Sequence, residues 1–294
     1  MNRSLLNNTT KHQAPRVKVR SEPLFFPSHG HPLYGMFCRP TEESCKETAL
    51  IACHGVGLEH AVTSRMMVLA VRQAAEHGYP ALVYHSRGHG DSSGDFAELT
   101  FESLVEDARS AAEHALQLSG ARRVVWLGVR VGALVAAAAA VQHPNSAGLV
   151  LWEPPASGAD NFHQLLRGLQ FSAVARGEKE VPKTNEVLET IERDGRADIH
   201  ACYFYAKFHH SMRDLKLAKI LEQWTGPVFY AQIQARIKLS AGNAGIVAAL
   251  EQQGCKVTTT RIAEEPGWQF LMWRVPWTST VLLEDTMRWL DELA

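Results

Sequence analysis

The sequence predicts an α/β protein with a mostly parallel β-sheet that is covered by helices on both faces. Two observations carry this prediction. Short apolar runs alternate with longer segments of helical periodicity between residues 48 and 152, and the joins between them are short. The apolar runs are also continuous, as expected for strands that are buried on both faces. The length of 294 residues allows one large domain of this class.

The first elements predicted are a leader and a hairpin. Residues 1–20 are polar, with three basic residues in the last five positions, so we expect a flexible leader before a single domain over residues 21–294. Apolar runs at 24–26 and 33–37 flank the turn cluster Ser28-His29-Gly30-His31, which predicts a β-hairpin. The next run, at 48–53, predicts a buried strand that ends at His54-Gly55.

The strand-then-helix pattern continues along the middle of the chain. A helix that stops at Gly78 follows the third strand, and Thr100 has the hydroxyl expected of a helix cap. The helix that Thr100 begins should end at Gly120. Further strands are predicted at residues 81–84, 123–127, 147–152, 227–231 and 256–262, and further helices after Gly132 and at 241–253 and 278–293.

Residues 155–220 interrupt this pattern with charged segments and an aromatic cluster. An insertion between sheet strands lies above their carboxyl ends, where binding sites of α/β proteins form. We therefore expect residues 155–220 to form a helical lid over a site.

Composition excludes several classes of function. Thirty basic and thirty-one acidic residues give a net charge of −1, too balanced to hold nucleic acid by bulk electrostatics. The longest apolar stretch, residues 133–141, is far shorter than the roughly 20 residues that span a bilayer. With no apolar segment for a signal peptide, and five widely spaced cysteines that favour free thiols, the chain is expected to be cytoplasmic.

The most informative segment is Gly128-Val129-Arg130-Val131-Gly132, which follows a predicted strand and opens a small-residue helix. This is the frame of a nucleophile elbow, in which a tight turn exposes the central residue at the top of the sheet. The glycines let the strand and the helix approach closely. We expect Arg130 at this turn, with φ in the left-handed region.

Around the elbow, the chain resembles the α/β-hydrolase superfamily over nearly its whole length. His54-Gly55-Val56-Gly57 resembles the oxyanion-hole loop after the third strand, and the segment from His85 to Gly94 resembles the glycine-rich loop after the fourth. Residues 90–96, 128–133, 149–154 and 157–158 most resemble exosortase A system-associated hydrolases of type 2, from bacterial exopolysaccharide clusters. The resemblance implies an α/β-hydrolase fold with an eight-stranded, mostly parallel sheet and a helical lid.

The resemblance also implies that this chain has other residues at the positions where the family carries its catalytic residues. Arg130 stands at the nucleophile position, and an arginine side chain cannot lose a proton near neutral pH to attack an acyl carbon. Ala235 stands where the family carries the acid, and Trp268 stands where it carries the histidine base. All three positions of the Ser-His-Asp set are therefore substituted.

A replacement set of catalytic residues can be drawn from Ser92, His85 and Glu153. For the serine, the competing interpretation is turn chemistry in a glycine-rich loop, and for the histidine it is a structural hydrogen bond at a strand end. Neither a cofactor nor a metal site is expected.

Two groups of histidines are candidates for a metal site. His85, His89 and Asp91 could together resemble a metal site, but no second ligand cluster supports it. His209 and His210 stand in the predicted lid without a spaced partner.

Arg130 itself predicts an anion site. Its guanidinium, the N–H of Val131 at the helix start and the N–H groups of His54-Gly55-Val56-Gly57 should converge there, with His85 and Arg87 nearby. The competing interpretation pairs Arg130 with Glu153 or Asp95 as a structural plug, and Arg87 with another carboxylate as a brace for its loop.

Two functions of different classes stay open from the sequence. One is a hydrolase-like protein that binds a small anionic, glycan-related or lipid-linked ligand, or a protein partner in exopolysaccharide export. The other is an esterase or thioesterase with an unusual catalytic constellation.

Overall fold

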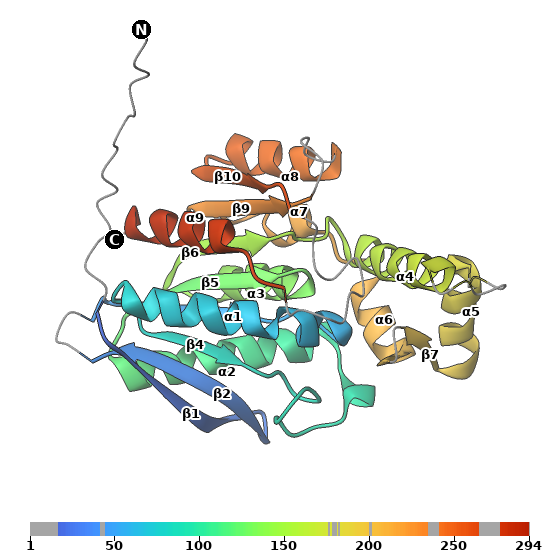
Figure 1. Ribbon diagram of the computed structural model, residues 1–294, viewed down its shortest axis with the longest axis horizontal. Helices are drawn as coiled ribbons and strands as arrows, with labels where there is room; N and C mark the ends of the chain where they lie inside the picture. Colours follow the sequence, from blue (N-terminus) through green and yellow to red (C-terminus); the bar gives the residue numbers. More distant parts are fainter. Residues whose placement is uncertain are drawn as a thin grey trace, which may run out of the picture.

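The computed structural model describes residues 17–41, 45–175, 177, 181, 183–199, 202–234, 241–264 and 277–293. Its main feature is an eight-stranded sheet in which β1 and β2 pair antiparallel, β2 pairs antiparallel with β4, and all later neighbours are parallel (Figure 1). In sheet order the strands are β1 Val19–Ser28, β2 His31–Pro40, β4 Ala81–Tyr84, β3 Thr48–Cys53, β5 Arg123–Val129, β6 Ser146–Trp152, β9 Val228–Ile233 and β10 Val257–Ile262. The predicted α/β architecture is confirmed.

Helices cover both faces of this sheet and bury two apolar cores. On one face lie α1 (Leu58–Glu76) and α9 (Thr280–Asp291), whose apolar sides share a core with one set of strand side chains. On the other face lie α2 (Phe101–Ser119), α3 (Val131–Gln142) and α8 (Ala241–Gln252). The alanine-rich sequence of α3 is buried on every side, which lets α3 pack closely against β5 and β6.

Local sequence signals predicted several of these elements correctly. The predicted hairpin is β1 and β2, which pair from Ser28 and His31 at the turn outward. Thr100 caps α2 by accepting from the Ser103 N–H at 3.1 Å, and the helix ends at Gly120 in the left-handed conformation. A short 3₁₀ turn, η1 (Phe96–Glu98), precedes this cap.

One predicted boundary needs correction. The leader was expected to reach residue 20, but β1 begins at Val19, and Val19 and Arg20 pair with residues of β2. The N–H of Val17 also donates to the carbonyl oxygen of Glu76 at 3.0 Å, so pairing with the rest of the fold already begins there. Residues 1–16 of the predicted leader lie outside the described residues.

The chain between β6 and β9 forms a separate group of elements beyond one end of the sheet (Figure 1). These are α4 (Gly158–Ala175), α5 (Thr184–Asp194), the antiparallel pair β7 (Arg196–Ile199) and β8 (Cys202–Tyr205), and α6 (Ala206–Met212). The last element of the segment, α7 (Leu217–Ile220), returns to the sheet and packs against α3 and α8. Phe162, Phe204 and Phe208 lie in edge or tilted contact beneath the other elements of the group, and all three belong to the core that α2 and α3 line. The aromatic cluster noted in the sequence therefore anchors this insertion.

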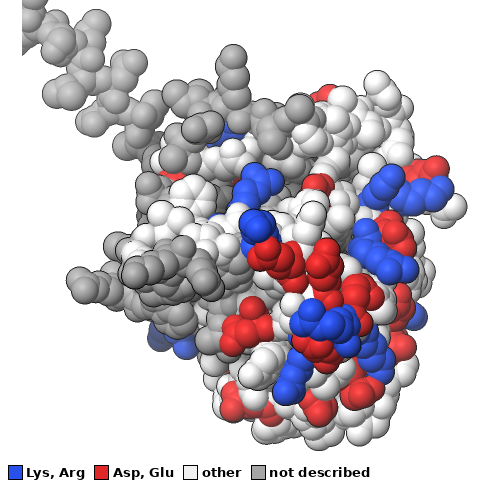
Figure 2. Space-filling model, turned by 90° about the vertical axis from the view of Figure 1, so that its right-hand side faces the viewer, with Lys and Arg blue, Asp and Glu red and all other residues white. Residues whose placement is uncertain are grey.

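The surface of this end of the molecule carries charges of both signs. Lysines and arginines are interspersed with aspartates and glutamates on the face seen in Figure 2. Within the described ranges, no helix has the length and apolar character needed to cross a membrane.

Candidate functional site

The elbow (residues 128–132) has the backbone that the sequence predicts. Arg130 lies between the end of β5 and the start of α3 at Val131, with φ 56° and ψ −123°. A Cβ on Gly128 would lie 2.1 Å from the carbonyl oxygen of Gly132, and a Cβ on Gly132 would lie 2.2 Å from that of Cys53. Only glycine fits at these two positions, and the predicted turn geometry of Arg130 is confirmed.

The Arg130 side chain is buried, with 2% of its surface exposed, and its three nitrogens meet protein oxygens. Nε donates to Glu59 Oε1 at 2.8 Å, one terminal nitrogen donates to Gln164 Oε1 at 2.5 Å, and the other lies 3.4 Å from Asn161 Oδ1. Glu59 belongs to the first turn of α1, whereas Asn161 and Gln164 belong to α4. Arg130 therefore ties the elbow both to the α1 side of the fold and to the insertion.

The carboxylate that pairs with Arg130 was not the one expected. The sequence analysis named Glu153 and Asp95, but the close ion pair is formed by Glu59. Asp95 instead accepts from the Ala97 N–H at 2.9 Å and caps η1. Glu59 can reach the elbow because Gly55 lets α1 begin close by, since a Cβ on Gly55 would lie 2.8 Å from the Cβ of Glu59.

Glu153 lies at the end of β6, buried and with a positive φ of 44°. Its carboxylate accepts from the Ile233 N–H at 2.5 Å and from Gln234 Nε2 at 3.2 Å. Burial raises the pKa of this carboxyl, although the Ile233 N–H and the charge of Arg130 act in the opposite direction. Glu153 therefore links the ends of β6 and β9.

The oxyanion-like loop, residues 54–57, is held by His89. The Gly57 N–H points to His89 Nε2 at 3.4 Å, and His89 Nδ1 lies 3.2 Å from the carbonyl oxygen of Arg87. These contacts define a neutral ring that carries its proton on Nδ1, and burial lowers the His89 pKa to about 4. One of the N–H groups assigned to the predicted anion site is thus already engaged, and the side chain of Val56 lies in the core.

Arg87 braces the glycine-rich loop between β4 and η1. Its guanidinium contacts both oxygens of Asp107 on α2, with distances down to 2.7 Å, and Glu106 at 3.1 Å. The Ser28 hydroxyl donates to the same Asp107 carboxylate at 2.7 Å. This is the bracing interaction that the sequence analysis named as the alternative to ligand binding by Arg87.

Ser92, His85 and Glu153 are placed in different hydrogen-bonding groups. The Ser92 hydroxyl donates to the backbone carbonyl of His85 at 2.5 Å and accepts from the Tyr34 N–H at 2.8 Å. His85 Nδ1 accepts from the Asp91 N–H at 3.2 Å, and Glu153 bonds the end of β9. The contacts of Ser92 are the turn chemistry expected of a serine in a glycine-rich loop.

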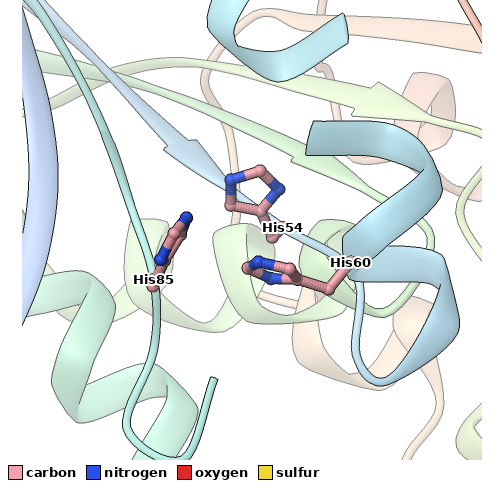
Figure 3. A group of neighbouring side chains, drawn as sticks. All are labelled: His54, His60 and His85. Carbon is pink, nitrogen blue, oxygen red and sulfur yellow. The ribbon is translucent and has the colours of Figure 1, made fainter. Parts of the chain in front are cut away.

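Three histidines meet beside the elbow, and we call His54, His60 and His85 the histidine cluster (Figure 3). Their ring centroids are 4.4 Å apart for His54 and His60, 4.9 Å for His60 and His85, and 5.9 Å for His54 and His85. Burial and the neighbouring imidazoles lower the pKa of His54 well below its usual value and that of His60 to about 3. Burial also lowers the pKa of His85.

His60 was missed by the sequence analysis. Its signal was its place six residues after His54, in the first turn of the helix that the oxyanion-like loop opens. The set considered instead was His85, His89 and Asp91. Both ring nitrogens of His89 have protein partners, and Asp91 Oδ2 lies 3.8 Å from His85 Nδ1.

His209 and His210 form a second group with Glu192 at the outer surface of the insertion. Both rings contact the Glu192 carboxylate, at 3.2 Å from His209 Nδ1 and 2.8 Å from His210 Nε2. We interpret this group as a surface interaction in which an exposed carboxylate lies between two imidazoles.

A polar cavity of about 360 Å³ lies between the end of β6, α4 and the start of α8. Its lining includes three amides, two carboxylates and one guanidinium, from Gln164, Gln234, Asn243, Glu153, Asp160 and Arg167. Gln164 thus contacts Arg130 and also faces the cavity. Of these residues the sequence patterns indicated only Glu153, because the others come from α4, the end of β9 and α8, and nothing local shows that these three segments meet.

Ala235 and Trp268, which the resemblance predicts at the two other triad positions, lie outside the described residues. Among those described, the elbow carries an ion pair, the adjoining loop carries neutral histidines, and the cavity carries neutral and charged polar groups.

Comparison with known families agrees with this architecture. The family model described as serine aminopeptidase, S33, a hydrolase family, matches residues 44–194, just over half of the chain. The chain belongs to this family. The match includes the elbow, the oxyanion-like loop, the loop after β4 and the first half of the insertion. No curated protein sequence matches the chain.

Solved structures similar to this family member include two esterases. Est1E from Butyrivibrio proteoclasticus, with ferulic acid bound, has 14% identity and a TM-score of 0.63 over 92% of this chain and 98% of its own. The Pyrococcus furiosus esterase Pf2001 has 14% identity and a TM-score of 0.61, over 93% and 89% of the two chains. The hypothetical protein PA2218 from Pseudomonas aeruginosa matches over 100% of both chains, at 12% identity and a TM-score of 0.56. These likenesses show the α/β-hydrolase fold.

Proposed function

We propose that this family member binds a small polar ligand in the cavity between β6, α4 and α8, and does not use the elbow for hydrolysis. The observation that carries the proposal is the state of Arg130. Its guanidinium is buried against Glu59, Gln164 and Asn161, so the nucleophile position holds an ion-paired cation. A catalytic triad needs a deprotonable nucleophile at this position, and arginine cannot supply one.

The cavity chemistry favours a sugar-type ligand over a strongly anionic one. Amide groups both donate and accept hydrogen bonds, and carboxylates accept them, so this lining complements hydroxyl groups. Arg167 is the cation of the lining and is exposed, while Glu153 and Asp160 oppose a second negative charge. The volume of about 360 Å³ lies in the range of small-molecule sites, roughly 300–1,000 Å³.

A ligand with an acidic group can also bind in this cavity. Arg167 can meet a carboxylate or phosphate at the cavity mouth, while Arg130, already paired with Glu59, acts behind Gln164. The anion site first expected at Arg130 is thereby moved to the cavity, and sugar acids join neutral sugars as candidate ligands. A glycan-related ligand would also agree with the resemblance to exosortase-associated hydrolases, as would a partner in exopolysaccharide export.

The test is a thermal-shift and calorimetric screen of neutral sugars, sugar acids and sugar phosphates. A ligand at about 100 times its Kd should stabilise the chain by about 2.7 kcal/mol. Asp160→Ala removes a cavity carboxylate and should weaken binding at least tenfold. Thr259→Ala changes a smaller cavity near β10 and α9 and should leave binding unchanged. Equal affinity in wild type and Asp160→Ala would place the ligand elsewhere.

The second candidate is an esterase with a different nucleophile, and the observation that favours it is the fold shared with two esterases. It predicts turnover of p-nitrophenyl esters that Ser92→Ala or His85→Gln abolishes. Our proposal predicts background rates in all three proteins.

A further inference from the structure

The histidine cluster is assembled by three elements that are separate in the sequence. His54 follows β3, His60 lies in the first turn of α1, and His85 follows β4. One ring nitrogen from each lies within 4.8 Å of a ring nitrogen of both others. Figure 3 shows the three rings turned toward a common space.

The ring nitrogens of this cluster differ from those of His89 in what they contact. His54 is about nine-tenths buried, and its Nδ1 has no hydrogen-bond partner among the described residues. His85 uses Nδ1 to accept from the Asp91 N–H, and that edge of the ring faces Gly90, which leaves Nε2 as its ligating atom. Both ring nitrogens of His89 form hydrogen bonds with backbone groups. In Figure 3 the two nitrogens of His54 lie on opposite sides of its ring, and Nε2 is the one on the side of His85.

The chemistry of imidazole also suits a metal ligand set. A neutral imidazole offers a lone pair to a metal, so binding competes with protons for the ligating nitrogens. Three rings this close would repel one another if they were charged.

We propose that His54, His60 and His85 bind one divalent transition-metal ion, of the Zn²⁺ type, through one nitrogen each. Tetrahedral zinc with Zn–N distances of about 2.0–2.1 Å places its ligand nitrogens about 3.3 Å apart. Small rotations of the three rings close the gap from 4.8 Å. The all-nitrogen set selects zinc, copper, nickel or cobalt over magnesium and calcium, which prefer oxygen ligands.

Three protein ligands leave one coordination position for water or for a ligand oxygen. Asp91 supplies the outer contact that such sites use, since its Oδ2 lies 3.8 Å from His85 Nδ1. Metal binding through His85 Nε2 requires the ring proton to move to Nδ1, which gives up the hydrogen bond from the Asp91 N–H; the new Nδ1–H then turns toward the Asp91 carboxylate. The site is thus built without any residue of the substituted triad.

The experiment is a titration of the untagged, chelator-treated full chain with Co²⁺, followed by displacement with Zn²⁺. We expect one equivalent to bind with micromolar affinity or better and to give the visible absorption of four-coordinate cobalt. His60→Gln should weaken binding at least tenfold. His85→Gln should also weaken binding at least tenfold. Because His85 lies in a loop and not in α1, this variant replaces His60→Gln if circular dichroism shows that His60→Gln does not fold.

His210→Gln is the matched control, because it removes an imidazole from the other histidine group of the described residues. It should change affinity less than twofold. The proposal is overturned if no stoichiometric binding occurs, or if His210→Gln abolishes binding while His60→Gln and His85→Gln leave it unchanged.

Discussion

The elbow and the histidine cluster lie side by side at the end of the sheet, yet their buried ionisable groups carry opposite charge states. The Arg130 guanidinium is charged, and protein oxygens meet its three nitrogens. The cluster holds neutral rings, and His54 Nδ1 has no partner among the described residues. The elbow therefore holds a charged group that is paired with a carboxylate, whereas the cluster one loop away holds neutral groups that can still accept a ligand.

The difference follows from the energetics of burial. A buried cation cannot persist without a compensating carboxylate, so the arginine requires Glu59 beside it. A buried imidazole can shed its charge and remain, at the smaller cost of an unused nitrogen. We therefore expect Arg130 to stabilise the fold and the histidine cluster to bind a ligand.

The largest effect should come from removing the Arg130 counter-ion. Glu59→Gln leaves a buried guanidinium without its carboxylate and should lower the free energy of unfolding by about 3–5 kcal/mol. The measurement is urea denaturation at pH 7.5. A double variant, Glu59→Gln with Arg130→Met, removes the charge as well and should recover most of the loss. A loss below 1 kcal/mol in the single variant would show that the pair contributes little.

His60 of the histidine cluster and the neighbouring His89 should make the metal-free protein sensitive to acid. The folded pKa is about 3 for His60 and about 4 for His89, whereas an unfolded histidine titrates near 6.5. The unfolded chain therefore binds more protons below pH 6.5, and stability falls as the pH falls from 6.5 toward 4. From pH 7 to 5 these two histidines together should cost about 3–4 kcal/mol of stability in the presence of a chelator.

A double substitution, His60→Gln with His89→Gln, serves as the control for this acid sensitivity. It should make the pH dependence of unfolding shallower over the same range, with the remainder due to His54 and His85, whose pKa values are also lowered. An unchanged slope would assign the loss to other groups.

A smaller effect is expected at Ser92. Its hydroxyl bonds the His85 carbonyl and the Tyr34 N–H, so Ser92→Ala should destabilise the fold by about 1–2 kcal/mol. Its ligand binding and ester hydrolysis should equal those of wild type. Loss of an enzymatic activity in this variant, with stability intact, would instead make Ser92 a reacting group.

The smallest effect is expected at the outer surface of the insertion. His210 is 45% exposed and pairs with an exposed Glu192, so His210→Ala should leave the melting temperature within error of wild type. A clear drop would show that the insertion depends on this pair.

Sequence patterns predicted the scaffold better than the contacts of the site. The strands at 48–53 and 81–84 and the caps at Thr100 and Gly120 follow from local signals, and the elbow follows from its glycines. Glu59 was missed because it is 71 positions from Arg130, and their meeting depends on the angle at which α1 leaves Gly57. His60 was missed for the same reason, since a helix position alone does not indicate which loops it faces.

The central claim is that the elbow carries structure, and its most direct test is labelling with a fluorophosphonate. Wild-type chain would be incubated with the reagent beside a known serine hydrolase, and intact mass would be measured. We predict an unmodified mass for wild type, and also for Arg130→Ser, which introduces a hydroxyl at the elbow and leaves the rest of the sequence unchanged. Stoichiometric labelling of any serine in the wild-type chain would contradict the account.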